Sequence, residues 1–248
     1  MFRGYYIASN GILNQQRTLN TISNNIANSQ TPGFKADVSL QNTFKRQLIL
    51  LGKGKNNSTG TIEYKYTDKS FTSLSQGTFE FTKKPLDVAI QGPVYFNVQT
   101  PTGEKRLTRN GQFKIDDEGY LAVAGAGRVL GENGPIQVGK SDFSITNDGQ
   151  IYVDGNRIDR LSLSYVDSTQ NVQKYGDNTF TLLNGATGEI PQGTEYSIIQ
   201  GAYERSNVDI STEMTRAMSA QRSFEAMSQA LKQIDSINQR TANELAKI

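Results

Sequence analysis

No glycine or proline occurs after Gly201 in this chain of 248 residues. Both residue types oppose helix formation, proline by ~3 kcal/mol and glycine by ~1 kcal/mol relative to alanine. In this tail, side chains suited to packing recur at alternating steps of three and four residues, which is the heptad pattern of a coiled coil. The pattern predicts one long helix over 206–248. Its seam consists of Ala217, Ala220, Phe224, Met227, Leu231, Ile234, Asn238, Thr241, Leu245 and Ile248.

The first residues of the chain show the same spacing. Pro32 disfavours helical geometry at Thr31, and Gly33 permits a turn with positive φ, so an N-terminal helix is expected to end within 28–33. Residues 1–35 contain three basic side chains and no acidic one. The N-terminal seam consists of Tyr5, Ala8, Ile12, Gln15, Leu19, Ile22 and Ile26.

The two narrow seams leave two interpretations open. The helices can form an antiparallel pair within one chain, lying on the middle domain. Alternatively, they can build a helical layer shared by many chains, because a stripe only two residues wide suits a coiled-coil contact. A transit peptide or a membrane-surface helix is disfavoured, because the polar face of the N-terminal segment is mostly Asn, Gln, Ser and Thr.

The middle of the chain has the pattern of β structure. Twenty of the 23 glycines lie between Gly52 and Gly201, and apolar residues alternate over 86–90, 94–98 and 161–165. The segments 113–125 and 143–155 share one pattern, which predicts a strand, a tight turn with glycine and a return strand. A further hairpin turn is expected at Asn110-Gly111.

These observations predict an α+β protein with a discontinuous helical domain and a central antiparallel β barrel or sandwich. We expect an N-terminal helix and turn over 1–35, a linker or arm that ends in a ribbon over 36–80, a β domain over 81–205 and the C-terminal helix over 206–248.

The composition excludes much chemistry. The chain has no Cys and no His, so it has no disulfide, no thiolate nucleophile and no His-based dyad or metal site. The formal net charge of +2 does not favour nucleic-acid binding. No apolar run approaches a membrane span, and no Sec-type signal peptide is visible. We expect no catalytic residue, cofactor, metal or small-molecule substrate. Two alternatives stay open, namely a helix-mediated adaptor module and, remotely, a carboxylate-based glycan hydrolase.

The motifs at both ends resemble one family. Residues 23–35 read SNNIANSQTPGFK and are similar to the SNNxANxxTxGFK helix end of bacterial flagellar rod and hook proteins. Residues 206–214 and 221–226 are similar to the SNVDxxxEM and QRxxE motifs of the same family. The segments 85–90, 108–113 and 131–136 also fit, so the resemblance covers nearly the whole chain.

The resemblance implies a structural subunit of the flagellar basal-body rod, not an enzyme, with the proximal rod type favoured over the distal one. In this family the terminal helices form the inner layer of a tube that transmits torque and carries an export channel, with the β domain outside. The implied partners are copies of the chain, other rod and hook proteins and the flagellar type III export apparatus. The implied location is the basal body in the cell envelope or periplasm, reached without a cleaved signal peptide.

The residues expected to act follow from the seams and the motifs. The two seams carry assembly, and the polar Asn238 helps to set register. The resemblance assigns the N-terminal family motif to Asn24, Asn25, Ala27, Asn28, Thr31, Pro32, Gly33, Phe34 and Lys35. It adds Asn207, Val208, Asp209, Glu213, Gln221 and Arg222 to the C-terminal assembly residues.

Overall fold

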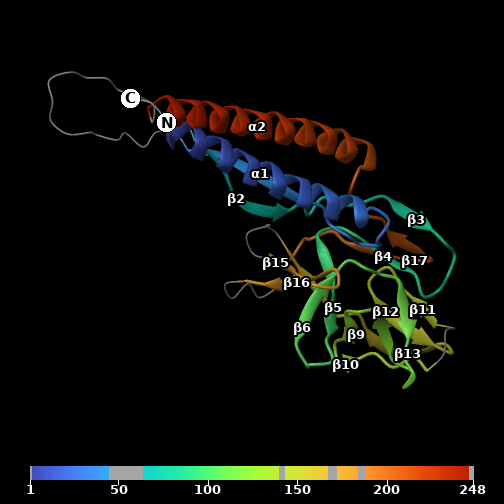
Figure 1. Cartoon of the computed structure of the whole chain (residues 1–248). Coiled ribbons are helices and arrows are strands. Elements are labelled where there is room, and N and C mark those ends of the chain that lie inside the picture. Colours follow the sequence, from blue (N-terminus) through green and yellow to red (C-terminus); the bar gives the residue numbers. More distant parts are fainter. Residues whose placement is uncertain (1, 45–63, 140–142, 167–171, 184–187, 246–248) are drawn as a thin grey trace. The chain divides into compact units, whose positions relative to one another are not determined.

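The computed structural model describes residues 2–44, 64–139, 143–166, 172–183 and 188–245 (Figure 1). These residues form two compact units. The helical unit takes the described parts of Met1–Ile26, Asp37–Phe71 and Ile210–Ile248. The β unit takes those of Ala27–Ala36 and Thr72–Asp209. The chain is thus α+β, as expected, whereas the expected domain boundaries at 35, 80 and 205 stay predictions.

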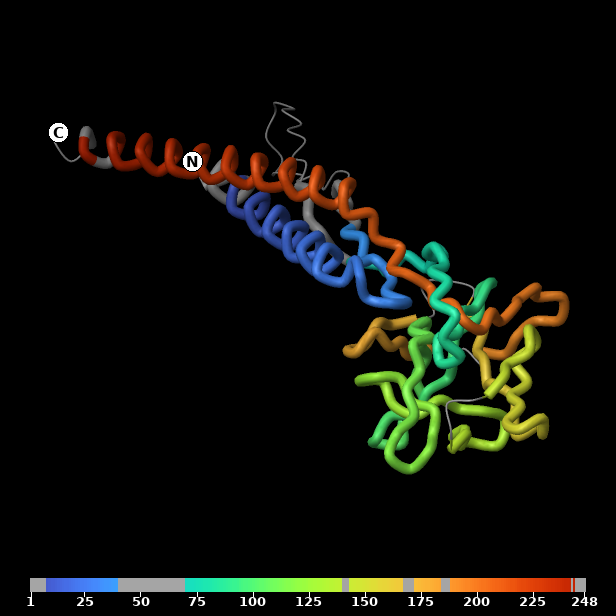
Figure 2. Tube along the Cα trace, turned by 90° about the vertical axis from the view of Figure 1, so that its right-hand side faces the viewer, coloured from blue at the N-terminus to red at the C-terminus, as the bar shows by residue number. Residues whose placement is uncertain are grey.

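The helical unit contains two helices and one ribbon. Helix α1 spans Phe2–Ala27 and helix α2 spans Ile210–Leu245. They lie side by side in the cartoon and in the tube view turned by 90° (Figures 1 and 2). Strand β1 (Asp37–Phe44) pairs with β2 (Tyr64–Thr72), so part of the expected arm is a two-stranded sheet. The polar tract at 52–60 lies outside the described residues.

The β unit is built from short antiparallel strands. The largest sheet follows the order β15-β16-β6-β5-β9-β8-β7, with β10 beside β9 and β14 beside β5. Three smaller sheets pair β11-β12-β13, β17-β4 and β18-β3. The described strands form no closed barrel. The strands are β3 (Phe79–Phe81), β4 (Val88–Gln91), β5 (Val94–Gln99), β6 (Lys105–Thr108), β7 (Phe113–Ile115), β8 (Leu121–Val123), β9 (Gly127–Gly131), β10 (Gly134–Pro135), β11 (Phe143–Ile145), β12 (Gln150–Val153), β13 (Asn156–Arg160), β14 (Leu163–Tyr165), β15 (Val172–Tyr175), β16 (Thr179–Leu182), β17 (Ser197–Gln200) and β18 (Ala202–Glu204).

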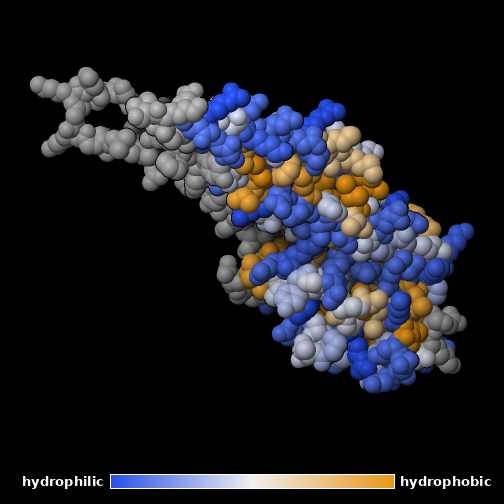
Figure 3. All heavy atoms as spheres, viewed as in Figure 1, coloured by the Kyte–Doolittle hydropathy of each residue, from blue (hydrophilic) through white to orange (hydrophobic). Residues whose placement is uncertain are grey.

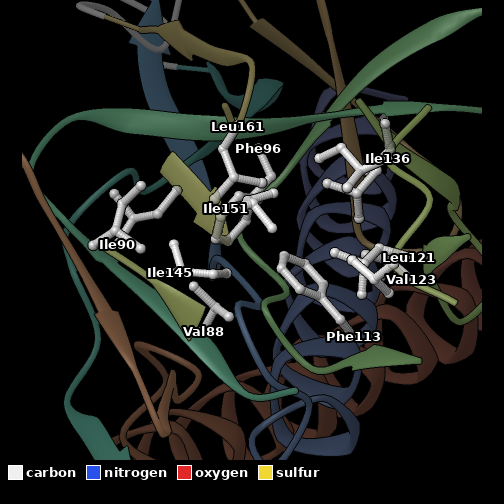
Figure 4. Packing of buried hydrophobic residues seen from close by; sticks show 14 of the residues in the cluster. Val88, Ile90, Phe96, Phe113, Leu121, Val123, Ile136, Ile145, Ile151 and Leu161 are labelled. Carbon is white, nitrogen blue, oxygen red and sulfur yellow. The ribbon is translucent and has the colours of Figure 1, made fainter. Parts of the chain in front are cut away.

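Strand β5 is buried on both faces and separates two hydrophobic clusters. The larger cluster contains Phe96, which packs edge-on against Phe113 with ring centres 5.0 Å apart (Figure 4). The smaller cluster contains Tyr95, which packs edge-on against Phe180 at 5.7 Å. Successive side chains of a strand point to opposite faces, so one strand can serve both clusters. This core lies within the β unit and holds the strands that carry the site described below.

The repeated sequence pattern folds into two hairpins, as predicted. Strands β7 and β8 pair Phe113 with Val123, and strands β11 and β12 pair Phe143 with Val153 in the same register. Each tight turn places a glycine at positive φ, 85° at Gly119 and 88° at Gly149. The two copies therefore share a register as well as a sequence pattern.

The prediction of a hairpin turn at Asn110-Gly111 is wrong. Strand β6 pairs with β5 and β16, whereas β7 pairs with β8, and neither Asn110 nor Gly111 has the positive φ of the expected turn. Instead, Gly111 accepts a hydrogen bond from the Val88 N–H at 2.9 Å. A Cβ on Gly111 would lie 1.6 Å from the Val88 carbonyl oxygen. Glycine is therefore required here because two backbone segments approach closely, not because the chain reverses.

Replacing Gly111 by alanine is expected to destabilise the β unit by ~3 kcal/mol or more, since the added Cβ overlaps a backbone atom that cannot rotate away. Urea unfolding of Gly111→Ala against the unmodified chain measures this. Gly176→Ala is the matched control, because a Cβ there meets no atom within 4 Å. Equal stability of the two variants would contradict the close-approach explanation.

Candidate functional site

The segment after α1 forms the turn that the sequence predicts. The Thr31 N–H donates to the Asn28 carbonyl at 3.1 Å, and the Phe34 N–H donates to the Thr31 carbonyl at 3.2 Å. Gly33 has a φ of 66°, a conformation that favours glycine. A Cβ on Gly33 would lie 2.3 Å from the Arg109 carbonyl carbon. The turn therefore needs glycine both for its own geometry and for its contact with the β unit.

Several groups of the β unit hold this turn. The Gly33 N–H donates to the backbone carbonyl of Glu204 at 2.7 Å. Asn178 donates from Nδ2 to the Pro32 carbonyl at 2.8 Å. The Lys174 ammonium donates to the Lys35 carbonyl at 2.9 Å and lies 3.7 Å from the centre of the Phe34 ring. The motif residues 32–35 are thus held by strands β15 and β18 and by the turn between β15 and β16.

A buried carboxylate lies at the centre of the contact. Glu204 Oε1 accepts hydrogen bonds from Lys35 Nζ at 2.7 Å and from the Gly77 N–H at 2.9 Å. Glu204 Oε2 accepts one from Arg109 Nη1 at 3.0 Å. The side chains of Lys35, Arg109 and Glu204 are 0%, 3% and 1% exposed. We call these three residues the Glu204 cluster.

The cations of the Glu204 cluster also satisfy backbone carbonyls. Lys35 Nζ donates to the Ser75 carbonyl at 2.7 Å. Arg109 donates to the carbonyls of Ile90 and Gly92, and its guanidinium lies 4.6 Å from the centre of the Tyr95 ring. Two cations nevertheless share one carboxylate. Desolvation by burial lowers the pKa of the Lys35 ammonium; Glu204 opposes this shift and Arg109 adds to it. Burial likewise raises the pKa of the Tyr95 hydroxyl.

Asn207 of the C-terminal motif supports the same part of the β unit. Its Oδ1 accepts the Ala36 N–H at 2.7 Å, and its Nδ2 donates to the carbonyls of Ser73 and Ser75, each at 3.0 Å. The Asn207 N–H also donates to the Phe34 carbonyl at 3.3 Å. One amide side chain thus joins the segment after the N-terminal turn to residues 73–75.

Asn25 has a similar role in the helical unit. Its Nδ2 donates to the Asp37 carbonyl at 2.8 Å, and its Oδ1 accepts the Asp37 N–H at 2.9 Å. The same Nδ2 lies 3.5 Å from Glu213 Oε2 on α2, and Arg216 donates to Glu213 Oε1 at 2.9 Å. Asn25 is 2% exposed. The motif asparagine therefore ties α1 to β1 and to α2.

The helices α1 and α2 are antiparallel. Asn25 meets Glu213, and a Cβ on Gly11 would lie 2.6 Å from the sulfur of Met227. A step from residue 25 back to 11 on α1 thus corresponds to a step from 213 forward to 227 on α2. Of the predicted seam residues whose side chains are described, only Ile22 and Ala220 are fully buried, and the others are half-buried. The helices pair, but the seam is incompletely covered.

A groove explains part of this incomplete coverage. It has a volume of about 440 Å³ and lies within the helical unit between α1, α2 and β1. Its lining includes Gln15, Thr18, Ser39, Ser219 and Ser223. The hydroxyls of Thr18 and Ser39 are buried without a hydrogen-bond partner among the described residues. Short polar side chains therefore leave the seam hollow at this level.

The structure does not bring all predicted residues together. Asn24, Ala27, Asp209, Gln221 and Arg222 are exposed. Asn28 and Val208 are half-buried. The side chains of Tyr5, Leu245 and Ile248 lie outside the described ones. The prediction missed Glu204, and it quoted Arg109 within a family motif without giving it a role. No spacing pattern signals Glu204, because its partners are 169 and 95 residues away.

The described residues bear on two other kinds of function. They contain no group of three or more Asp or Glu side chains placed to hold a metal ion. Neither described helix is long and apolar enough to cross a membrane.

Comparison with known proteins gives matches along the chain. A family model described as flagella basal body rod protein matches residues 6–35, one for the D1 domain of the hook protein FlgE/F/G matches 89–153, and one for the C-terminal part of the basal body rod protein FlgEFG matches 199–245. The rod protein FlgF of Rhizobium meliloti is 30% identical over 228 residues, which cover 91% of this chain and 90% of the relative. The chain belongs to the flagellar basal-body rod protein family.

Other relatives give the same result. The rod protein FlgG of Caulobacter vibrioides is 30% identical over 95% of this chain and 96% of its own length. The hook-basal body complex protein FlhO of Bacillus subtilis is 25% identical over both full lengths. The chain is thus a structural protein of the bacterial flagellar basal body, not an enzyme. Relatives named FlgF and FlgG match at the same identity, so the proximal assignment stays a prediction.

The rod protein's Lys35 yields a pH-dependent prediction. Burial lowers the pKa of Lys35 in the folded chain below its usual 10.5. At pH values between the lowered pKa and 10.5, the unfolded chain therefore binds more protons than the folded chain. The free energy of unfolding should therefore rise with pH across this window. In Lys35→Met this contribution should vanish. The free energy of unfolding of the variant should therefore exceed that of the unmodified chain by the largest amount at pH values below the window.

Urea unfolding of both proteins between pH 7 and 10.5 measures the difference. The raised pKa of Tyr95 acts in the opposite direction above its usual 10.0 and is common to both proteins. Parallel stability curves for the two proteins would contradict the assignment.

Proposed function

We propose that this rod protein assembles through α1 and α2 into a tubular axial filament that transmits torque and surrounds an export channel. Its partners are copies of itself and other rod and hook proteins. The half-buried seam supports this, because it leaves apolar side chains that a neighbouring chain can cover. Polymerisation would then be driven by burial of apolar area, at roughly 25 cal/mol per Å².

One observation carries the proposal. Ile210, Met214 and Met218 are 36%, 51% and 57% exposed on α2. They are spaced by four residues, so they lie along one side of the helix, next to the seam. We call them the outer stripe. Ile237, further along α2, is 60% exposed, and Figure 3 shows hydrophobic side chains gathered on the helical unit. Exposed apolar patches of this kind typically mark protein contacts.

The export route follows the same reasoning. We propose passage through the flagellar type III apparatus into the periplasm without a cleaved signal peptide. A chain free of disulfides suits unfolded passage through a narrow channel, and this sequence contains no cysteine. The family motifs at both ends, including Asn24 and Arg222, would act in assembly after export.

Met218→Asp is expected to raise the critical concentration for polymer formation at least about tenfold, because a charge would be buried at the contact. The thermal stability of the monomer should stay unchanged, because Met218 is exposed in the single chain. Electron microscopy and sedimentation of concentrated protein, alone and with a second rod protein, measure this. Ala230→Asp is the control, since Ala230 is exposed and, at roughly 100° per residue, lies about 120° around α2 from Met218. Unchanged assembly of Met218→Asp would refute the role of the outer stripe.

Hydrogen exchange gives a second test. In dilute monomer, the amides of α1 and α2 should exchange faster than those of β5, whose side chains are almost fully buried. In the polymer, the helix amides should become protected. Helices that are fully protected in the dilute monomer would contradict assembly-dependent ordering.

A further inference from the structure

The Glu204 cluster joins three distant parts of the β unit. Lys35 follows the N-terminal turn, Arg109 follows β6, and Glu204 ends β18. Lys35 and Arg109 each form an ion pair with the Glu204 carboxylate. The backbone takes part as well, because the Gly33 N–H donates to the Glu204 carbonyl. The turn is therefore held by the side chain and the main chain of the same residue.

Without Glu204, the docked turn would be electrostatically unfavourable. Lys35 and Arg109 would then be two buried cations with no anion in the cluster. A buried charge whose partner is removed is strongly destabilising. Even with Glu204 present, the lowered pKa of Lys35 shows that burial of this ammonium is costly. The attraction of Glu204 offsets this cost and allows the Lys35 ammonium to be buried.

The residue that supplies this attraction comes late in the chain. Glu204 lies 169 residues after Lys35 and 95 residues after Arg109. In the folded chain Glu204 lies on β18, which pairs with β3 and places Glu204 opposite Phe79. The N-terminal turn thus lacks its counter-charge until the last strand of the β unit is in place.

We propose that the Glu204 cluster is a closure latch, which docks residues 31–36 onto the rest of the β unit only after strand β18 has paired. The two ends of the β unit then become fixed in one step. A chain that is still incomplete or partly unfolded keeps its N-terminal turn undocked. The latch is a property of the single chain, so its test does not depend on the proposed assembly.

Glu204→Gln in the full-length chain tests the latch. The substitution keeps the size of the side chain and removes its charge. Hydrogen exchange at the amides of Gly33 and Ala36, both hydrogen-bonded in the docked turn, should accelerate by about 100-fold or more. The amide of Asn97 in β5, which donates to the Ser162 carbonyl, should change far less. Equal acceleration at all three sites, or none at the turn, would overturn the proposal.

A double variant separates charge from packing. Lys35→Met in the Glu204→Gln background removes one of the two uncompensated cations and should restore at least tenfold of the lost protection. A role for Glu204 in shape or hydrogen bonding alone would give no such rescue, and absence of rescue overturns the latch. If Glu204→Gln does not fold, the double variant decides: folding with a protected turn supports the latch, and failure to fold overturns it.

The matched control is Glu80→Gln on the neighbouring strand β3. Glu80 lies 3.7 Å from Arg205, and both side chains are about half exposed. Surface pairs of this kind contribute little. Exchange at Gly33 and Ala36 should stay within about threefold of the unmodified chain, and a change as large as that in Glu204→Gln would overturn the proposal.

Discussion

The sharing of one buried carboxylate by two cations is the interaction on which the arrangement of the β unit's ends depends. Glu204 is 1% exposed and contacts Lys35, Arg109 and the backbone at Gly77. Buried ion pairs add little net stability, because desolvation offsets their attraction, but they are sensitive to geometry. Here the geometry requires that segments near residues 35, 109 and 204 occupy fixed positions together. The cluster therefore specifies which segments meet, while the hydrophobic clusters around β5 supply most of the stability.

The sequence predicted the regular elements better than the contacts between them. Heptad spacing indicated a helical segment near each end of the chain, and the repeated pattern at 113–125 and 143–155 identified two hairpins, because periodicity is a local property. Asn110-Gly111 failed as a turn signal, because the same glycine also serves where two backbones approach closely, as at Val88. Family resemblance pointed to Lys35, Asn25 and Asn207, but no pattern pointed to Glu204, whose role exists only in the folded chain.

The helical unit is physically unlike the β unit. A two-stranded ribbon is marginal by itself, and isolated helices depend on packing for their stability. The seam between α1 and α2 is half-buried, and polar residues such as Thr18 and Ser219 leave a groove beside it. Asn25 supplies directional contacts, but an amide cannot replace missing apolar burial. A unit with this little internal burial gains most when another chain covers it, whereas the β unit buries residues such as Phe96 completely without help. This contrast is the physical reason for proposing that assembly uses the helices, whereas the β unit already has a buried core of its own.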